Sequence, residues 1–458
     1  MSAAPRIRII GGGLAGPEAA LVAARRGVAV DLYEMRPVRT TPAHQTADFG
    51  ELVCSNSLKS ESENTAPWLL KQEMRRAGSP LLACADASAV PAGHALAVDR
   101  VEFSRQIGAA IAAEPKITAR REEVTRLDPE DGITIVASGP LTSPALSAEI
   151  ARLTGREHLS FYDSISPIVE ADSIDRERVY FAARYDKGTA DYINCPMNQA
   201  EYEAFHDALR TAESVEAKEW EKLDYFEGCL PLEELARRGR DTLRFGPMKP
   251  VGLRDPRTGK MPWAVVQLRV ENLRADSYNL VGFQNHMKYG EQARIFRMIP
   301  GLQQAKFLRY GQIHRNTYIN SPQVLTPLFH LREHPRVFFA GQISGVEGYT
   351  ESMATGLLAG LYATAFAHGR VPEPVPRGTA LGSLVRYVTE ADPKHFQPAN
   401  ITFDLLEPLD DTTRRQVRDK RERHRIQCER ALATLGSWWR RLEESAGSPS
   451  GIDLIPLA

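Results

Sequence analysis

Two cysteines lie in segments where a thiol could act as a nucleophile. Cys54 ends an apolar stretch that runs into Ser and Asn residues, which can cap a turn or a helix. Cys229 lies between a glycine and a proline that restrict the backbone on either side. A thiolate attacks readily when a cation or a helix N-terminus lowers its pKa. Residue type alone also allows a small buried hydrophobe at both positions, and we expect that role for Cys84, Cys195 and Cys428.

The remaining polar residues offer one further candidate. His314 could stack on a flat ligand or carry a proton near neutral pH, and a structural histidine is the alternative. The spacing of His, Cys, Asp and Glu is not typical of a metal site, and neither a Gly-x-Ser-x-Gly nor a P-loop motif occurs, so we expect no metal and no catalytic triad. Five cysteines without a closely spaced pair indicate a reducing compartment.

The first forty residues predict a dinucleotide site. Residues 6–10 have the apolar pattern of a buried strand, and residues 17–24 that of a helix. Between them, Gly11, Gly13 and Gly16 have the G-x-G-x-x-G spacing. The first glycine permits a tight turn, the second allows close approach of a pyrophosphate, and the third lets the helix pack on the strand. The phosphates would bind the N-terminus of this helix, where unpaired N–H groups favour anions.

A carboxylate and the order of motifs indicate which dinucleotide is bound. Residues 28–33 predict a second strand, which ends at Glu34, about where a ribose-binding acid is expected. In flavoproteins with two dinucleotides the FAD motif opens the chain, and no second glycine motif follows a later strand here. FAD is therefore favoured over NAD.

Later segments complete the expected fold. Residues 132–139 and 336–341 predict further strands, and residues 350–367 predict a helix whose N-terminus could stabilise a reduced flavin. We expect an α/β fold with a discontinuous, glutathione-reductase-like Rossmann-type FAD-binding domain and an inserted α+β domain. Residues 199–221 of the insert are helical in period. The expected parts are 1–150 and 318–445 for the FAD-binding domain, the latter with a basic C-terminal helix, 151–317 for the insert and 446–458 for a tail.

Charge restricts the possible partners. Lys and Arg total 57 against 58 Asp and Glu, so the net charge of −1 excludes bulk attraction of nucleic acid. Residues 414–441 nevertheless contain ten Lys or Arg and three Asp or Glu, beside Trp438 and Trp439. This pattern suits a phosphate backbone, and a solvated helix with inward-packed tryptophans is the alternative.

No stretch has the length and apolarity of a signal peptide or spanning helix, so we expect a cytoplasmic protein without a membrane partner.

Seven segments together resemble one family, the bacterial folate- and FAD-dependent tRNA (uracil-5-)-methyltransferases. They are GGGLAGPEA at 11–19, YEMRP at 33–37, ELVCSNSL at 51–58, PAGHALAVDR at 91–100, NCPM at 194–197, FGPMKPVG at 245–252 and GVEGYTES at 345–352. The resemblance implies that 5,10-methylenetetrahydrofolate donates a carbon, that FAD reduced by NADH or NADPH supplies electrons, and that uridine 54 of the tRNA T-loop becomes 5-methyluridine.

The resemblance also implies roles for particular residues. The family's two functional cysteines correspond to Cys54 and Cys229, and we assign Cys229 as the nucleophile toward C6 of uracil. Cys54 would act near the flavin, in proton transfer or in guarding a one-carbon intermediate. His314 would face the folate pterin, and Tyr349 would approach the isoalloxazine ring. Motif and resemblance together assign as cofactor-binding Gly11, Gly12, Gly13, Leu14, Ala15, Gly16, Glu34, Arg36, Gly139, Gly341 and Tyr349.

The target uridine must be flipped out of a folded tRNA, which costs a few kcal/mol that cationic contacts must offset. The expected RNA-binding residues are Arg237, Arg238, Arg240, Arg414, Arg415 and Arg418. Three other functions remain open: methylation of a ribosomal uridine by the same chemistry, oxidation or reduction of a small metabolite by the flavin, and RNA binding without catalysis.

Overall fold

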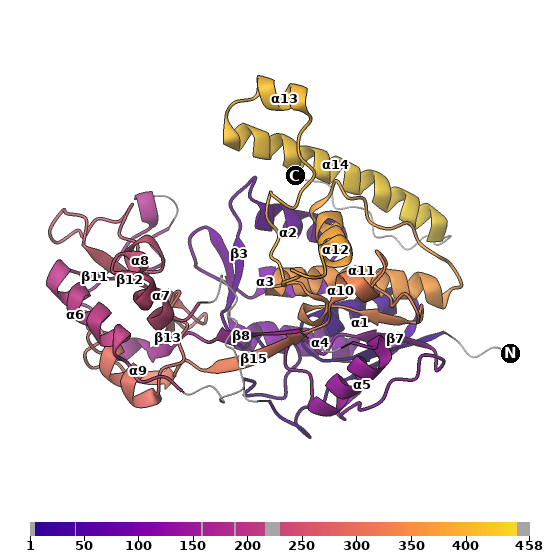
Figure 1. The fold of residues 1–458 in the computed structure, drawn as a ribbon, viewed down its shortest axis with the longest axis horizontal. Helices are drawn as coiled ribbons and strands as arrows, with labels where there is room; N and C mark the ends of the chain where they lie inside the picture. Colours follow the sequence, from indigo (N-terminus) through magenta and orange to yellow (C-terminus); the bar gives the residue numbers. More distant parts are fainter. Residues whose placement is uncertain (1–4, 42, 157–158, 187–188, 216–229, 447–458) are drawn as a thin grey trace.

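Figure 1 shows the protein as two lobes, with a long helix lying across the larger one. The structure is a computed structural model that describes residues 5–446 apart from 42, 157–158, 187–188 and 216–229. Each lobe has its own hydrophobic core. The core of the larger lobe combines side chains from both ends of the described chain, from Ile7 to Trp439.

The larger lobe is built on a parallel sheet of five strands. Its order is β16-β7-β1-β2-β6, and every neighbouring pair is parallel. These strands are β1 (Arg6–Ile10), β2 (Ala29–Tyr33), β6 (Ile117–Arg120), β7 (Ile133–Val136) and β16 (Val337–Phe339). Helices cover a parallel sheet on both faces, which explains why its strands are rich in Ile and Val. The strand expected at 6–10 is confirmed at both ends, and those expected at 28–33, 132–139 and 336–341 are confirmed to within three residues.

Helices surround this sheet. They are α1 (Ala15–Arg25), α2 (Ala66–Arg76), α3 (Pro80–Ala87), α4 (Arg100–Ala113), α5 (Pro144–Thr154), α10 (Ser321–Val324), α11 (Tyr349–Ala367) and α12 (Ala380–Glu390). The closest packing joins α1 and α11 through small residues. A Cβ on Gly356 would lie 2.4 Å from the Ala15 carbonyl oxygen, and a Cβ on Gly360 would lie 2.9 Å from the Ala19 Cα. The Gly- and Ala-rich composition of α11 thus lets it lie directly on the first helix.

The smaller lobe is built on an antiparallel sheet of order β10-β11-β12-β13-β9-β14. Its strands are β9 (Ile168–Glu170), β10 (Tyr180–Phe181), β11 (Ile193–Met197), β12 (Ala264–Val270), β13 (Ser277–Leu280) and β14 (Phe307–Arg309). Its helices are α6 (Gln199–Arg210), α7 (Leu232–Arg238), α8 (Thr242–Phe245) and α9 (Tyr289–Phe296), with the 3₁₀ turns η1 (Ala171–Ser173) and η2 (Arg184–Asp186). The expected insertion of an α+β segment agrees with this arrangement, whereas its boundaries at 151 and 317 stay a prediction.

Two small sheets lie between the lobes. Strands β8 (Leu159–Ser164) and β15 (Ile313–Tyr318) pair antiparallel and carry the chain into and out of the smaller lobe. A second sheet, β3-β5-β4, consists of Ser57–Ser60, Ala95–Val98 and Ala89–Val90 and follows the Cys54 segment. The 3₁₀ turn η4 (Gln342–Ser344) follows β16.

Two expected helices differ from the structure. The helix at 199–221 ends as α6 at Arg210, because Val215 N–H instead donates to the His286 carbonyl at 2.9 Å. The helix at 414–441 is two helices, α13 (Asp411–Gln416) and α14 (Lys420–Ala446). Asp419 separates them by capping α14, since its carboxylate accepts from Glu422 N–H at 2.8 Å.

The tryptophans of α14 point into the larger lobe. Trp438 and Trp439 are 0% and 2% exposed, and Trp438 Nε1 donates to the Glu373 carbonyl at 3.1 Å. The tryptophans therefore pack inward and do not present their rings to a ligand. None of the helices that the structure describes is both long enough and apolar enough to cross a membrane.

Candidate functional site

The glycine loop between β1 and α1 has the three features that its spacing predicts. Gly11 adopts φ +117°, and a Cβ there would lie 2.2 Å from the Ala137 carbonyl oxygen at the end of β7. A Cβ on Gly16 would lie 1.8 Å from the Gly11 carbonyl oxygen. By contrast, a Cβ on Gly13 would meet no atom within 4 Å. The outer glycines therefore close the turn, and the central one leaves backbone accessible to a ligand.

The two helices that border this loop begin without side-chain caps. Among the described residues, no capping side chain accepts from the first N–H groups of α1 at Leu14 or of α11 at Gly348. Helices α2 to α5 of the same lobe are each capped, by Thr65, Ser79, Asp99 and Ser143. The uncapped N–H groups and the helix dipoles can stabilise anionic groups of a ligand.

A pocket opens to solvent beside the loop and encloses about 990 Å³ when the solvent at its mouth is included. Its lining includes ten of the eleven residues expected to bind the cofactor: Gly11, Gly12, Gly13, Leu14, Ala15, Glu34, Arg36, Gly139, Gly341 and Tyr349. Gly16 lies behind the loop, where it contacts Gly11. The open Gly13 backbone beside an uncapped helix fits a dinucleotide pyrophosphate.

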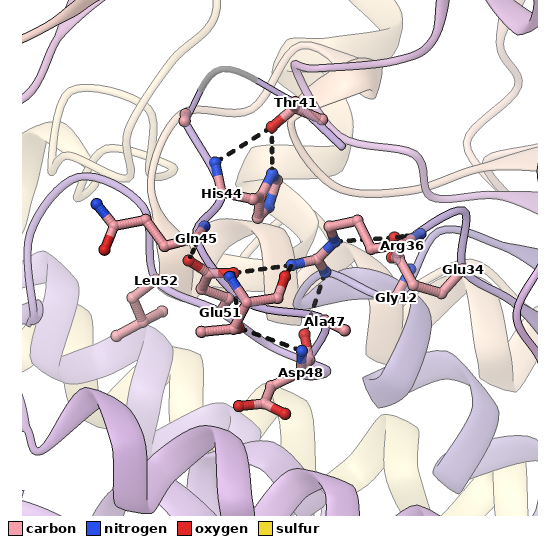
Figure 2. Close-up of polar contacts among 12 residues, drawn as sticks. Gly12, Glu34, Arg36, Thr41, His44, Gln45, Ala47, Asp48, Glu51 and Leu52 are labelled. Atoms are coloured by element: carbon pink, nitrogen blue, oxygen red, sulfur yellow. Dashed lines mark hydrogen bonds and ion pairs between the residues drawn. The ribbon is translucent and has the colours of Figure 1, made fainter. Parts of the chain in front are cut away.

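Glu34 lies at the end of β2 and faces the glycine loop (Figure 2). Its Oε2 accepts from Gly12 N–H at 2.8 Å, and its Oε1 accepts from the N–H and Nε of Arg36, both at 2.9 Å. Burial alone would raise the pKa of Glu34, but the hydrogen bonds and charge of Arg36 outweigh burial and lower it. Glu34 is therefore a carboxylate at neutral pH and can accept ribose hydroxyls.

Arg36 organises the loop that follows. Its guanidinium is 2% exposed and also donates to Glu51 Oε2 at 2.9 Å and to the carbonyls of Thr46 and Asp48, both at 3.1 Å. Figure 2 shows the chain around Asp48 and Glu51 gathered about this side chain. These contacts support a positioning role, in which Arg36 shapes the pocket wall through Glu34 and Glu51.

Sequence reasoning missed part of the pocket wall. After β7, Ser138 Oγ and Thr142 Oγ1 lie 2.7 Å apart, and Thr142 donates to the Gly139 carbonyl at 2.9 Å. Glu122 and Glu123, after β6, also line the pocket. These residues follow the ends of parallel strands, where ligands of such sheets bind, so the strand pattern alone could have indicated them.

Tyr349 connects the pocket to the Cys54 segment. Its hydroxyl oxygen accepts from Cys54 N–H at 2.8 Å and from Ser55 N–H at 3.2 Å. Burial, followed by the charge of Cys54, raises the pKa of Tyr349, so its hydroxyl stays protonated. The predicted pair Cys54 and Tyr349 is thus brought together at the first turn of α11.

Two arginines lie near Cys54. Arg100 donates to the carbonyls of Leu52 at 2.6 Å and Cys54 at 3.0 Å, and to Glu271. Burial and the Arg100 charge lower the pKa of Arg309, while Tyr349 and Cys54 oppose that shift. Cationic neighbours favour the thiolate form of a cysteine. Neither arginine was assigned from the sequence, because the contacts join positions far apart in the chain.

The Cys54 segment is also bonded to the smaller lobe. Asn56 is fully buried, and its amide donates to the Val270 carbonyl of β12 at 3.0 Å. Arg269 returns two hydrogen bonds, to Asn56 Oδ1 at 2.9 Å and to Ser55 Oγ at 3.1 Å. The cysteine segment is therefore held by α11 on one side and by β12 on the other.

The sequence also singled out His314 and three further cysteines, Cys229, Cys195 and Cys428. Cys229 lies outside the described residues. His314 lies in β15, opposite Asp163 of β8. Cys195 and Cys428 are buried, and burial raises the pKa of both thiols, that of Cys428 to about 12, which agrees with a hydrophobic role.

The basic residues expected to bind RNA lie on two surfaces. Arg414, Arg415 and Arg418 lie in and just after α13, are exposed, and form no ion pair within the described chain. At the end of α7, Arg237 pairs with Glu234, and Arg240 lies 3.4 Å from Glu203, while Arg238 is exposed. The structure therefore leaves more uncompensated positive charge at α13 than at α7.

Comparison with known proteins gives a consistent result. Residues 6–371 match the family model described as "Glucose inhibited division protein A". A protein of Koribacter versatilis called methylenetetrahydrofolate--tRNA-(uracil-5-)-methyltransferase TrmFO is 70% identical over 94% of this chain and 98% of its own. Proteins of the same name from Solibacter usitatus and Heliobacterium modesticaldum are 64% and 56% identical, each over 94% of this chain and 97% of their own.

The fold has solved counterparts. Two crystal forms of Aquifex aeolicus GidA superpose with TM-scores of 0.72 and 0.71 at 16% identity. Each match covers 98% of this chain, and 75% and 78% of the respective GidA chains. At this identity the likeness shows the fold, which is the expected Rossmann-type FAD-binding architecture with an inserted domain.

Proposed function

The chain belongs to the glucose inhibited division protein A family and, within it, to the methylenetetrahydrofolate--tRNA-(uracil-5-)-methyltransferases, and we propose that it forms 5-methyluridine at position 54 of tRNA. The identity of 70% over 98% of a relative with this activity in its name carries the proposal. The reaction is a folate-dependent methylation of tRNA uracil. Its substrates are tRNA and 5,10-methylenetetrahydrofolate, and its cofactor is FAD.

The residues of the pocket can hold FAD. The N–H groups of the glycine loop and the start of α1 would bind the pyrophosphate, and Glu34 would accept the ribose hydroxyls. Tyr349, at the first turn of α11, places its ring in the pocket wall and its hydroxyl against the Cys54 backbone. When bound and reduced, FAD supplies the electrons that convert the transferred carbon to a methyl group.

We assign the two cysteines separate tasks. C5 of uracil becomes nucleophilic once a thiolate adds to C6, and Cys229 is proposed for this addition. C5 then bonds to the one-carbon unit, which separates from tetrahydrofolate. Removal of the C5 proton and cleavage of the C6–S bond restore the C5–C6 double bond and release the thiolate. Cys54 is proposed for proton transfer, because Arg100 and Arg309 bring positive charge close to it and the Tyr349 hydroxyl accepts from its backbone N–H.

Three further assignments rest on the family resemblance. His314 would stack against the folate pterin. NADH or NADPH would reduce the flavin without a nucleotide fold of its own. Because tRNA, folate and reduced nicotinamide nucleotides occur together in the cytoplasm, we propose a cytoplasmic site of action.

A reconstituted reaction tests the function. Purified protein loaded with FAD is incubated with 5,10-methylenetetrahydrofolate, NADPH and an unmodified tRNA transcript, and the digested RNA is analysed by mass spectrometry. We expect 5-methyluridine at position 54 only when every component is present. A tRNA that stays unmodified while a ribosomal RNA fragment is methylated would refute the tRNA target.

Cysteine variants test the division of tasks. We expect Cys229→Ser to lose covalent capture of tRNA that contains 5-fluorouridine, because the attacking sulfur is gone. Cys54→Ser should keep a flavin that NADPH reduces, but lose methylation by at least about 100-fold, the usual effect of removing a proton-transfer group. Cys84→Ser is the control and should behave as wild type. Normal capture by Cys229→Ser would show that another group attacks C6.

A further inference from the structure

Two segments of the smaller lobe, 180–185 and 245–261, carry exposed apolar side chains. Twelve large hydrophobic residues are strongly exposed in the described chain. Five of these twelve lie in two segments, 180–185 and 245–261: Phe181, Tyr185, Phe245, Val251 and Met261. Phe245 is 78% exposed although it is aromatic, and no function assigned above uses it. Exposed apolar side chains mark an interaction surface when they lie together, so the contacts between the two segments matter.

Polar contacts hold parts of the two segments in a fixed arrangement. Arg184 donates through Nη1 to the carbonyls of Lys249 at 3.0 Å and Val251 at 2.5 Å. Tyr185 N–H donates to the Gly252 carbonyl at 2.6 Å. A Cβ on Gly252, which has φ +85°, would lie 2.8 Å from Tyr185 Cε1. The loop at 246–252 therefore begins directly after Phe245, and its last residue packs against Tyr185.

Positive charge accompanies these rings. Residues 244–260 contain five Lys or Arg and one acid, Asp255. Asp255 is already paired with Arg257 at 2.7 Å. Lys249, Arg254 and Lys260 are exposed and form no ion pair with another described residue. Arg176 lies over the Phe181 ring at 5.6 Å. Exposed aromatic rings among unpaired cations are the composition of surfaces that bind unstacked nucleotides.

We propose that this surface, which we call the Phe245 edge, docks nucleotides of the tRNA other than the methylated uridine. Phe245 stacks on an unpaired base, and Lys249 and Arg254 contact adjacent phosphates. The edge lies in the smaller lobe, whereas the glycine loop lies in the larger one (Figure 1). The proposal rests on the tRNA methylation inferred above and identifies a second contact region for the same substrate.

Binding and kinetics of variants test the Phe245 edge in the FAD-loaded enzyme. We expect Phe245→Ala to raise the Kd for unmodified tRNA about 10-fold, since loss of one stacked base has an effect of this order. The KM for tRNA should rise similarly while kcat and the rate of flavin reduction by NADPH stay constant. Phe245→Trp should retain wild-type affinity, because it keeps a stacking ring. Lys249→Glu should lower the slope of log Kd against log salt by about one.

Matched surface variants provide the controls. Val371 is also 78% exposed, so Val371→Ala changes an equally accessible apolar residue outside the edge, and Lys394→Glu reverses an exposed charge elsewhere. Both should bind tRNA as wild type does. Unchanged Kd and salt slope in Phe245→Ala and Lys249→Glu would overturn the docking proposal. That result is separate from failure of the proposed function, in which the wild-type enzyme itself leaves position 54 unmethylated.

Discussion

At the scale of single residues, Glu18 is a buried carboxyl group whose titration should be measurable. It lies in the first turn of α1, is 0% exposed, and accepts from Leu81 N–H at 2.9 Å through Oε2. Burial raises the pKa of Glu18 from 4.5 to about 7. The folded state thus binds this proton more tightly than the unfolded state does. The free energy of unfolding should therefore fall as pH rises from about 4.5 to 7.

Glu18→Gln should remove that part of the pH dependence. An amide keeps the acceptor for Leu81 and carries no charge, so we expect the variant to be more stable than wild type at pH 8 by about 2 kcal/mol, an order-of-magnitude value. At pH 5 the two proteins should unfold at similar denaturant concentrations. Denaturant melts at both pH values check this, and an equal difference at pH 5 and 8 would exclude the titration of Glu18.

Residues that act within one stretch of chain could be predicted from the sequence, whereas residues brought together by folding could not. The roles of Gly11 and Gly13 follow from their spacing, because the turn they form is local. The contact of Tyr349 with Cys54 joins positions 295 residues apart. The Arg269 contacts with Asn56 cross between lobes. Local pattern carries no information on which distant strand lies beside a given loop.

At the scale of elements, the contact between α1 and α11 depends on missing side chains. We expect Gly356→Ala to destabilise the protein by about 1–3 kcal/mol, because its Cβ would lie 2.4 Å from a backbone oxygen of α1. The variant should also retain less FAD, since α1 and α11 both border the pocket. Thermal melts and the flavin absorbance of the purified protein measure both effects.

Gly436 is the matched control for this substitution. It lies inside α14, and a Cβ there would meet no atom within 4 Å. Gly436→Ala should therefore stabilise the protein by about 0.5–1 kcal/mol through the gain in helix propensity. The same change of residue thus has opposite signs in two helices. Destabilisation by both variants would show that a general effect on helices, not the packing on α1, decides the outcome.

The ends of elements were less predictable than their existence. The uncharged, small-residue composition of residues 350–367 correctly indicated α11, whereas helical periodicity was less reliable for two other helices. It extended the helix at 199 too far, because charged residues beyond Arg210 keep a helical period while the backbone pairs with His286. It also joined α13 to α14, since a single capping residue, Asp419, marks the break.

At the scale of the whole molecule, the positive charge of α13 and the start of α14 should decide much of the attraction for RNA. We expect the fourfold variant Arg414→Glu, Arg415→Glu, Arg418→Glu and Arg421→Glu to weaken tRNA binding strongly and to reduce the salt slope by roughly three. All four side chains are exposed, so folding should not change. Filter binding at several salt concentrations measures the slope.

Arg105→Glu provides the comparison. Arg105 is 65% exposed on α4 and pairs with Glu102, so its reversal adds negative charge outside both basic surfaces. It should leave the salt slope near the wild-type value. An unchanged slope in the fourfold variant would exclude α13 as an RNA contact and would leave the Phe245 edge as the candidate surface.

The pocket wall combines parts made early and late in synthesis. The glycine loop is complete after residue 16, but Gly341, Gln342, Tyr349 and Ser352 form the opposite side of the pocket. A nascent chain that lacks these residues has the glycine loop but not α11, which lines the same pocket. The ribosome must therefore translate past α11 before the flavin can be retained. A fragment that stops before residue 337 should consequently purify without the yellow colour of the complete protein.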